Sequence, residues 1–348
     1  MGLGIRNKKP VKSDSKNHCI IMGVTGRGKT HFGSTCPDSF SIGWDDRVYG
    51  VDGIAGINVR TLQNDILYPK VLDRKFILFL ASNQDKVEDY QKVEFKDGLS
   101  KFCFSEIIRG IKEKKKLTIE EIITSASVKF PKNINMIKGI FERQVMANDE
   151  VDGIVERINY RNYFIKDLGD FEKEDKGLQL KIFRILTEEI LSEGYKTLNL
   201  DDGKSFVTMC ANFKLEEEGI SEFGDLAMGK FYPIYREFSQ EEMKNLLGKF
   251  NMVNVFCHED YVEISDEHSD TKHMVFYPDF GDKKCLNEEM ANWFTFVGRA
   301  ILDPDDEEHP YKIDFTPKKY SLSKSPFKLG IKEPIINEYK YLEEILKK

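Results

Sequence analysis

The sequence predicts an α/β protein with a mostly parallel sheet that is flanked by helices and interrupted by a helix-rich insertion. Three observations support this fold class. A glycine-rich loop at residues 23–30 separates an apolar run from a helix-compatible segment, helix and strand patterns alternate at 178–257, and residues 84–177 are charged and rich in helix signals. The expected parts are a basic N-terminal arm at 1–17, a core at 18–335 interrupted by an insertion or lid at about 84–177, and a C-terminal helix at 336–348.

The core is predicted to begin with a strand, a loop and a helix. Residues 18–22 are an apolar run that ends at the glycine-rich loop, and the segment THFGS after the loop can begin a helix. Pro37 then breaks the chain, and residues 40–44 alternate as a second strand that ends at two carboxylates. Residues 74–82 are the most apolar run and are expected to form a buried strand, although a helix fits the same pattern.

Helix signals dominate the predicted insertion. Thr118 and Glu121 have the spacing of a capping box, which predicts that a helix begins there. Residues 112–116, KEKKK, form a lysine cluster just before it. No internal repeat or low-complexity segment is apparent, so the sequence leaves the role of this region open.

Helix and strand alternate again after the insertion. Residues 178–192 place apolar side chains on one helical face, and the segment GYKTLNLDD follows as a turn and a strand. Ser239 and Glu242 form a second capping box, which predicts a helix that leads into the strand MVNVFC at 252–257. These alternations predict parallel strands joined by helices.

The C-terminal part is expected to contain two more strands, KHMVFYPDF and YKIDFTP, and two amphipathic helices. The apolar positions of the first helix are Met290, Trp293, Phe294 and Val297. Those of the C-terminal helix are Ile335, Tyr339, Leu342 and Ile345 or Leu346. The acidic segment at 303–308 is expected to be a solvated loop.

Charge is distributed unevenly along the 348 residues, whose formal net charge is −7. Residues 1–18 carry +4, residues 309–348 carry +4, and residues 19–308 carry −15. The basic ends fit either a simple aid to solubility or a surface that follows a nucleic-acid backbone. No apolar run is long enough for a membrane span and the N-terminus lacks the apolar core of a signal peptide, so a soluble, cytoplasmic protein without membrane contact is expected. The six cysteines show no CxxC pair and are expected to be reduced core thiols rather than a zinc site.

The loop matches the pattern G-x-x-x-x-G-K-[ST] in full, from Gly23 to Thr30. Glycines let the backbone N–H groups turn toward phosphate oxygens, and the helix that follows adds its positive end. Lys29 is expected to reach the β- and γ-phosphates, and the Thr30 hydroxyl is expected to bind Mg²⁺. The residues expected to contact the nucleotide are Gly23, Val24, Thr25, Gly26, Arg27, Gly28, Lys29, Thr30 and His31.

Such a loop needs a second acid that holds the metal, usually at the end of another strand. Asp201 ends the strand-like run of TLNLDD and is the first candidate, with Asp202 ranked after it. Asp45 and Asp46 compete for the metal or for activating the attacking water. The expected metal ligands are Thr30, Asp201 and Asp46.

The segment NVFCHED places His258 and Glu259 at the end of a strand, where a sheet's carboxyl edge faces a bound nucleotide. A polar residue there can sense the γ-phosphate, and Glu259 can orient water, although a histidine at a strand end also fits an ordinary surface position. The expected catalytic residues are Lys29, Asp201, His258 and Glu259. The guanine-specificity patterns NKxD and TKxD are absent from the sequence, which disfavours a GTPase.

Six segments in order give the chain a family resemblance: GVTGRGKTHFGSTCPDSFSIGWDD, GYKTLNLDD, NVFCHED, YPDFGDK, FTFVGRAI and SLSKSPFKL. Together they resemble the phage RecA-like ATPases of the Sak type, which are phage nucleotide-binding AAA-type domains. The positions that match the family pattern are Lys29, Thr30, Pro37, Asp45, Tyr195, Thr197, Asp201, His258 and Glu259. The resemblance covers residues 18–50 and 178–335, and Asn199 and Leu200 stand where the family has a plainer aliphatic run.

The resemblance implies a RecA-like P-loop NTPase core that binds ATP and Mg²⁺ and acts on single-stranded DNA in phage or viral recombination, repair or replication. It also implies a homo-oligomer in the host cytoplasm, phage recombination or replication proteins as partners, and a basic residue that reaches a neighbouring subunit's nucleotide. The candidates for that residue are Arg299, Lys324 and Lys328. The alternative is a nucleotide-dependent scaffold or switch that binds a protein through the insertion. A packaging motor would need a nuclease or portal-binding region that the sequence does not reveal.

Overall fold

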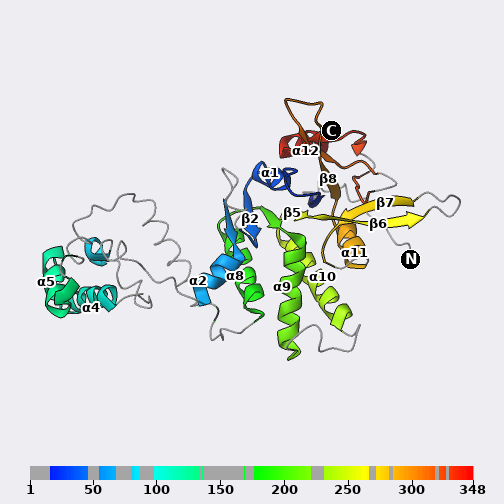
Figure 1. Cartoon of the computed structure of the whole chain (residues 1–348). Coiled ribbons are helices and arrows are strands. Elements are labelled where there is room, and N and C mark those ends of the chain that lie inside the picture. The colour runs from blue at the N-terminus through cyan, green and yellow to red at the C-terminus, as the bar shows by residue number, and fades with distance from the viewer. Residues whose placement is uncertain are drawn as a thin grey trace, which may run out of the picture. The chain divides into compact units, whose positions relative to one another are not determined.

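The computed structural model divides the chain into two compact units, residues 1–61 with 174–348, and residues 62–173 (Figure 1). The structure describes residues 16–45, 55–67, 80–85, 98–133, 135, 168, 176–220, 231–265, 272–281, 285–317, 321–326 and 329–347. Each unit is described separately below. The domain boundaries expected from the sequence stay predictions.

The first unit is built on an eight-stranded sheet with the order β10-β9-β8-β1-β5-β4-β2-β3. Its strands are β1 (Cys19–Met22), β2 (Ser39–Gly43), β3 (Ala55–Asn58), β4 (Thr197–Asp201), β5 (Met252–Cys257), β8 (Phe296–Leu302), β9 (Tyr311–Asp314) and β10 (Ile335–Ile336). The neighbours from β3 to β8 pair in parallel, whereas β9 and β10 are antiparallel additions at one edge. The prediction of a mostly parallel α/β sheet is confirmed.

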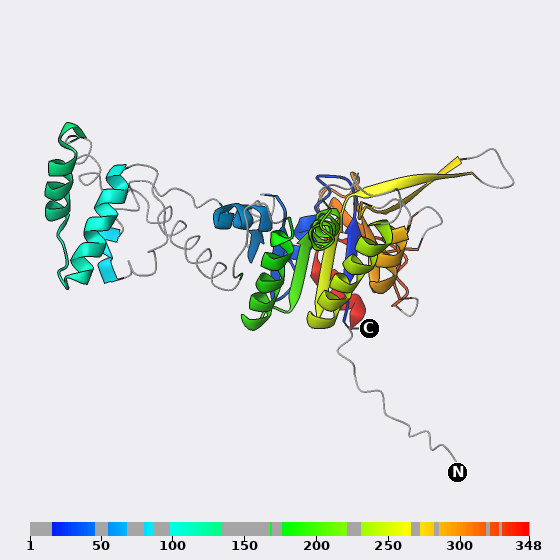
Figure 2. The same cartoon turned by 90° about the horizontal axis from the view of Figure 1, so that it is seen from below.

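Helices cover both faces of this sheet. They are α1 (Lys29–Ser34), α8 (Leu178–Ser192), α9 (Gly203–Glu217), α10 (Phe231–Lys249), α11 (Cys285–Trp293) and α12 (Tyr339–Leu346). Helix α2 (Val59–Leu67) follows β3 and contains the boundary between the two units. Phe32 of α1 and Leu342 of α12 pack into one apolar cluster with Ile21 and Phe256 of the sheet. Helices α8, α9 and α10 lie side by side over the other face, as Figure 2 shows. The strands between these layers are buried on both sides, which explains their nearly continuous apolar sequences.

Strand β5 is followed in the chain by a two-stranded antiparallel hairpin, which consists of β6 (Glu259–Ser265) and β7 (Lys272–Pro278). It begins one residue after His258 and is not part of the eight-stranded sheet. The segment KHMVFYPDF was expected as a strand, and β7 confirms it. His258, expected at the end of a strand, is therefore the single residue that connects β5 to β6, and Glu259 begins β6.

Three local expectations are wrong. Helix α10 begins at Phe231, so Ser239 lies inside the helix and does not cap it. Helix α11 ends at Trp293, and Val297 belongs to strand β8, where it pairs with Ile20 of β1. Ile335 lies in β10 rather than in the C-terminal helix, which begins at Tyr339. For Val297 and Ile335 a helical spacing was present, but pairing with another strand decided the structure.

The expected buried strand at 74–82 can be compared with the structure only in part. Residues 74–79 lie outside the described ranges, and residues 80–82 are helical rather than extended. The strand prediction is therefore wrong for those last three residues. Leu80 and Ala81 are nevertheless buried, as their apolar character requires.

The second unit contains helices α4 (Gly98–Lys112) and α5 (Ile119–Lys129), with the 3₁₀ turn η3 (Pro131–Asn133). The capping box at the start of α5 is confirmed, because the Thr118 hydroxyl accepts from Glu121 N–H and the Glu121 carboxylate accepts from Thr118 N–H. Ile107 of α4 and Ile122 of α5 are fully buried in a small core of their own. The unit therefore has a separate apolar centre.

Candidate functional site

The loop between β1 and α1 has the backbone conformation that its glycines allow. Gly26 and Gly28 have φ values of 81° and 75°, in the left-handed region that other residues rarely adopt. Asn337 donates from Nδ2 to the carbonyl of Gly28 at 2.8 Å, and a Cβ at position 28 would lie 2.7 Å from that nitrogen. Position 28 therefore requires glycine, both because of its left-handed backbone conformation and because Asn337 lies so close.

The side chain of Lys29 is folded back over this loop. Its Nζ donates to the carbonyls of Gly23 at 2.7 Å and of Val24 at 3.0 Å. Gly23 N–H in turn donates to the carbonyl of Cys257 at 3.2 Å, which ties the loop to the end of β5. The expected nucleotide ligands from Gly23 to His31 are thus held on one short turn, with Val24, Thr25 and Gly26 exposed.

Thr30 and Asp201 meet, although they are 171 positions apart in the sequence. The Thr30 hydroxyl donates to Oδ2 of Asp201 at 2.8 Å. Thr30 lies in the first turn of α1, and Asp201 is the last residue of β4. A hydroxyl oxygen and a carboxylate oxygen therefore lie side by side next to Lys29. Both are hard oxygen ligands of the kind that Mg²⁺ prefers.

Asp202 has a different role from its neighbour. Its Oδ1 accepts from the backbone N–H of Ser205 at 2.7 Å, which makes it the N-cap of α9. A carboxylate that caps a helix is engaged in local structure. Asp202 thus caps α9, whereas Asp201 contacts Thr30, and the ranking of the two as metal ligands stays a prediction.

The end of β2 lies beside the end of β4. Gly43 is in register with Asp201, and Trp44 N–H donates to the Asp201 carbonyl at 3.1 Å. Asp45 follows directly and is half-buried at the same edge of the sheet. Asp46, the third expected metal ligand, lies outside the described residues.

Glu259 and Arg299 form a two-pronged ion pair. Arg299 donates from Nε to Oε2 of Glu259 at 2.6 Å and from Nη2 to Oε1 at 2.9 Å, which raises the pKa of the guanidinium. Arg299 is in register with Met22, the residue just before the loop, and its guanidinium lies 3.9 Å from the ring centre of Phe276. The Glu259 carboxylate, which was expected to orient water, is thus held by Arg299 of β8, next to the end of β1.

The other expected catalytic and basic residues occupy less specific positions. His258 is half-buried between β5 and β6, and its carbonyl accepts from Asp279 N–H at 2.8 Å. Lys324 is half-buried, and burial lowers the pKa of its ammonium group. Lys328 lies outside the described residues. Contact of Arg299, Lys324 or Lys328 with a neighbouring subunit stays a prediction, although Arg299 is engaged within its own chain.

A buried polar row crosses the sheet beneath α1, and the sequence did not reveal it. Asn199 of β4 donates from Nδ2 to the Gly33 carbonyl of α1 and to the Ser41 hydroxyl of β2, each at 3.1 Å. Asn254 of β5 donates to Oδ1 of Asn199 at 2.8 Å. The departure at Asn199 from a plain aliphatic run therefore connects three strands to the helix that carries Lys29 and Thr30. The signal in the sequence was an asparagine in the middle of each of two apolar strands.

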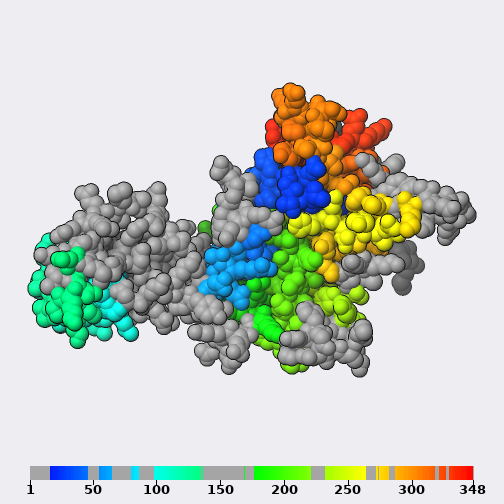
Figure 3. All heavy atoms as spheres, viewed as in Figure 1, coloured from blue at the N-terminus to red at the C-terminus, as the bar shows by residue number. Residues whose placement is uncertain are grey.

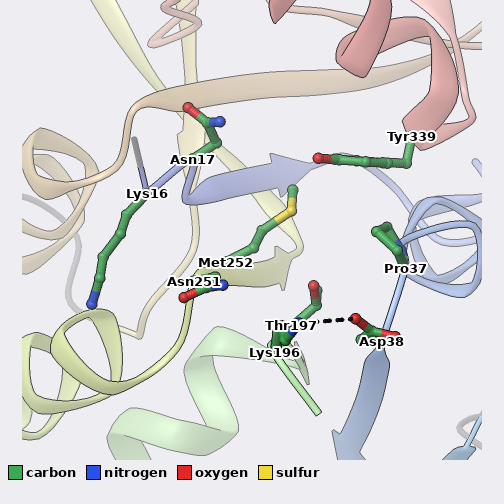
Figure 4. A pocket seen from close by; sticks show the side chains of 9 residues that line it. All are labelled: Lys16, Asn17, Pro37, Asp38, Lys196, Thr197, Asn251, Met252 and Tyr339. Atoms are coloured by element: carbon green, nitrogen blue, oxygen red, sulfur yellow. Dashed lines mark ion pairs between the residues drawn. The ribbon is translucent and has the colours of Figure 1, made fainter. Parts of the chain in front are cut away.

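A pocket of about 330 Å³ lies at the opposite edge of the sheet (Figure 4). Its lining residues stand at or before the starts of four parallel strands: Lys16, Asn17, Pro37, Asp38, Lys196, Thr197, Asn251 and Met252, with Tyr339 from α12. Lys196 and Asp38 in it form an ion pair at 3.8 Å. Because ligands of parallel α/β sheets bind at the carboxyl ends of the strands, this pocket is separate from the candidate site at the loop.

The cysteines of the described ranges are buried free thiols, at positions 19, 36, 103, 210 and 257. Burial raises the pKa of the Cys36 thiol to about 12, so it stays protonated at neutral pH. Within the same ranges, no group of three or more His, Cys, Asp or Glu side chains is arranged to hold a metal ion. Among the helices that the structure describes, none has both the length and the apolar character needed to cross a bilayer.

Comparison with protein-family models, with curated proteins and with solved structures finds no match.

Proposed function

We propose that the protein binds ATP with Mg²⁺ at the loop of residues 23–30 and hydrolyses it, and that its first unit is a RecA-like ATPase core. The observation that carries the proposal is the 2.8 Å contact between the Thr30 hydroxyl and Asp201. A full G-x-x-x-x-G-K-[ST] loop predicts that its threonine and a distant strand-end acid share one metal. The fold brings Thr30 and Asp201 together, which supports a shared metal site.

The contacts support a proposed role for each side chain. Lys29, whose Nζ lies within 3.0 Å of two loop carbonyls, is placed to neutralise the β- and γ-phosphates. Thr30 and Asp201 would hold Mg²⁺, which would offset the charge that develops on the phosphate oxygens. Asp45, at the neighbouring strand end, and Glu259 are the candidates that orient water, and Glu259 must first leave Arg299 to do so.

The sheet order supports a nucleotide site at this point. From β1 the chain crosses to β2 on one side, and after β5 it crosses to β8 on the other side of β1. The connections therefore diverge at the carboxyl end of β1, which is where open α/β sheets bind their ligands. The glycine-rich loop lies at this switch point.

Single-stranded DNA is the proposed substrate of the ATP-driven function, in phage or viral recombination, repair or replication and as part of a homo-oligomer. The support is the family resemblance together with the basic ends, each of which carries +4 in a chain of net charge −7. The competing function is a nucleotide-dependent scaffold or switch whose partner is a protein. It is favoured by the second unit, which has its own apolar core.

The first prediction is that Lys29→Ala abolishes nucleotide binding and hydrolysis in a folded protein, because it removes the charge that faces the β- and γ-phosphates. Nucleotide affinity and phosphate release are measured for both proteins, with and without single-stranded DNA. Lys249→Ala is the matched control, because Lys249 is an exposed lysine paired with Glu188 and its loss should have little effect. Full activity of Lys29→Ala would refute the nucleotide site. A wild-type hydrolysis rate that does not change when single-stranded DNA is added would favour the protein scaffold.

A further inference from the structure

We propose that Tyr311 is the platform on which the purine base of the bound nucleoside triphosphate stacks. This inference rests on the proposed function, because it extends the same site from its phosphates to its base. Tyr311 is the first residue of β9, which enters the sheet two strands away from β1. It belongs to no motif in the sequence and is found only through its contacts.

Tyr311 lies directly against the phosphate loop. A Cβ built on Gly28 would be 3.5 Å from Cδ1 and 3.6 Å from Cγ of Tyr311, so the ring is within contact distance of the residue just before Lys29. In the space-filling view, the C-terminal segment in orange and red lies against the blue N-terminal segment that carries the loop (Figure 3). Asn337 of the C-terminal segment bonds to the Gly28 carbonyl of the loop and to the Tyr311 carbonyl.

The ring is exposed, as a ligand platform must be. Tyr311 has 44% of its surface accessible, and Leu302, its partner across the β8–β9 pair, has 42%. An aromatic and an aliphatic side chain thus form a small apolar surface beside the loop. Stacking of a flat heteroaromatic ring would cover this surface without needing any new hydrogen bond.

The platform is held in place by its surroundings. Asn337 N–H donates to the Tyr311 carbonyl at 3.1 Å, and its Nδ2 donates to the Gly28 carbonyl at 2.8 Å. The turn before Tyr311 is closed by Lys312, whose Nζ lies 2.6 Å from Asp303 and 3.0 Å from Asp306. A fixed platform loses little conformational freedom when a ligand binds, which favours affinity.

The position of Tyr311 also fits the direction in which a bound nucleotide must extend from its phosphates to its base. Of the acids proposed to act at the terminal phosphate, Asp45 follows β2 and Asp201 ends β4, and both strands lie on one side of β1. Strands β8 and β9 lie on the other side, and there Tyr311 contacts the loop at Gly28. With its γ-phosphate toward Asp201, the nucleotide extends its sugar and base toward Tyr311.

A stacking platform predicts a particular specificity. Every base has a π-face, so stacking tolerates different bases and favours those with the larger ring system. We therefore expect ATP and GTP to bind more tightly than CTP and UTP. This preference should depend on Tyr311, whereas binding of the phosphates should not.

The experiment compares the affinities of the full chain for a non-hydrolysable ATP analogue and for inorganic tripolyphosphate, both with Mg²⁺. Tyr311→Ala should weaken binding of the analogue by about 5- to 150-fold and abolish the preference for purines over pyrimidines. Its affinity for tripolyphosphate should stay within about twofold of wild type. Tyr311→Phe should bind the analogue like wild type, because stacking needs the ring and not the hydroxyl. Tyr232→Ala, at a 51% exposed tyrosine on α10, is the matched control.

The outcomes separate the platform from the proposed function. Loss of analogue binding with tripolyphosphate binding retained supports the platform. If wild type binds both ligands and Tyr311→Ala affects neither, or weakens both equally, the platform is refuted while the nucleotide site stands. If wild type binds neither ligand, the proposed function is refuted and the platform with it. A wild-type protein that binds the analogue no better than tripolyphosphate refutes the platform without any variant.

Discussion

Asp201 and Asp202 are adjacent carboxylates with different contacts. Asp201 accepts from the Thr30 hydroxyl, whereas Asp202 caps α9 through Ser205 N–H. We predict that Asp201→Asn lowers Mg²⁺-dependent hydrolysis by about 100-fold or more, because the metal supplies several kcal/mol of charge stabilisation in the transition state. Nucleotide binding should partly survive, because Lys29 and the loop are intact. The measurement is the rate of phosphate release at saturating ATP over a range of Mg²⁺ concentrations.

Asp202→Asn is the matched control, since it makes the same chemical change one residue away. Asparagine caps helices about as well as aspartate, so the control should keep both stability and hydrolysis. A large effect of Asp202→Asn with none of Asp201→Asn would contradict the assignment of the metal ligand. If instead Asp45→Asn has the large effect, the acid at the end of β2 holds the metal.

At the scale of elements, local patterns predicted the structure well where a segment's own sequence decides it. The amphipathic face at 178–192 became α8, and the run before the loop became β1. Strand β8 was not predicted, because a helical spacing that reaches Val297 is also satisfied by a strand that pairs with β1. That pairing joins residues at opposite ends of the chain, and no local pattern encodes it.

The candidate site shows the same division. Thr30 and Asp201 could be matched from the sequence because each belongs to a recognisable local pattern, a P-loop and a strand-end acid. Tyr311 and the pairing of Arg299 with Glu259 could not, because their significance comes only from distances across the sheet. Their residue types are ordinary for exposed or strand-end positions.

The polar row beneath α1 gives a prediction about this element. Asn199→Leu keeps the branched shape of the side chain but leaves the Ser41 hydroxyl and the Asn254 amide without their Asn199 partner in a region that is buried. It also removes one hydrogen bond from the Gly33 carbonyl, which still accepts from Ser39 Oγ and Cys36 N–H. Each unsatisfied buried group costs about 1–3 kcal/mol, so the free energy of unfolding should fall by about 2–5 kcal/mol. Nucleotide affinity should fall as well, because the row positions the helix that carries Lys29 and Thr30.

Urea unfolding, followed by circular dichroism, measures this loss. The double variant Asn199→Leu with Asn254→Leu is the control, because it replaces both partners of one hydrogen bond with apolar groups and should recover part of the stability. A single variant as stable as wild type would show that the row does not hold α1. A double variant less stable than the single one would show that cavity or packing effects dominate.

At the scale of the whole molecule, the basic ends are the feature on which the DNA proposal depends. The structure limits which of their residues are available. Lys16 donates from Nζ to the carbonyls of Leu247 at 3.0 Å and of Gly248, so it is tied to α10. Lys324 is half-buried, and its backbone pairs with Val297. The candidates for phosphate contacts are therefore Arg6, Lys8, Lys9, Lys12, Lys318, Lys319 and Lys328, which lie outside the described residues.

The prediction is that wild type binds single-stranded DNA and that its affinity falls steeply with salt, because each neutralised phosphate releases condensed counterion. A variant that lacks residues 1–15 and carries Gln at 318, 319 and 328 should bind more weakly, with a salt slope smaller by about 0.7 per lost contact, up to about 5 for seven contacts. Lys324→Gln should leave the slope unchanged, and ATP binding should be normal in both variants. Affinity is measured at several salt concentrations with an ATP analogue present. Lack of wild-type binding at low salt would favour the protein scaffold, whereas an unchanged slope in the variant would move the DNA surface to the lysine cluster at 112–116.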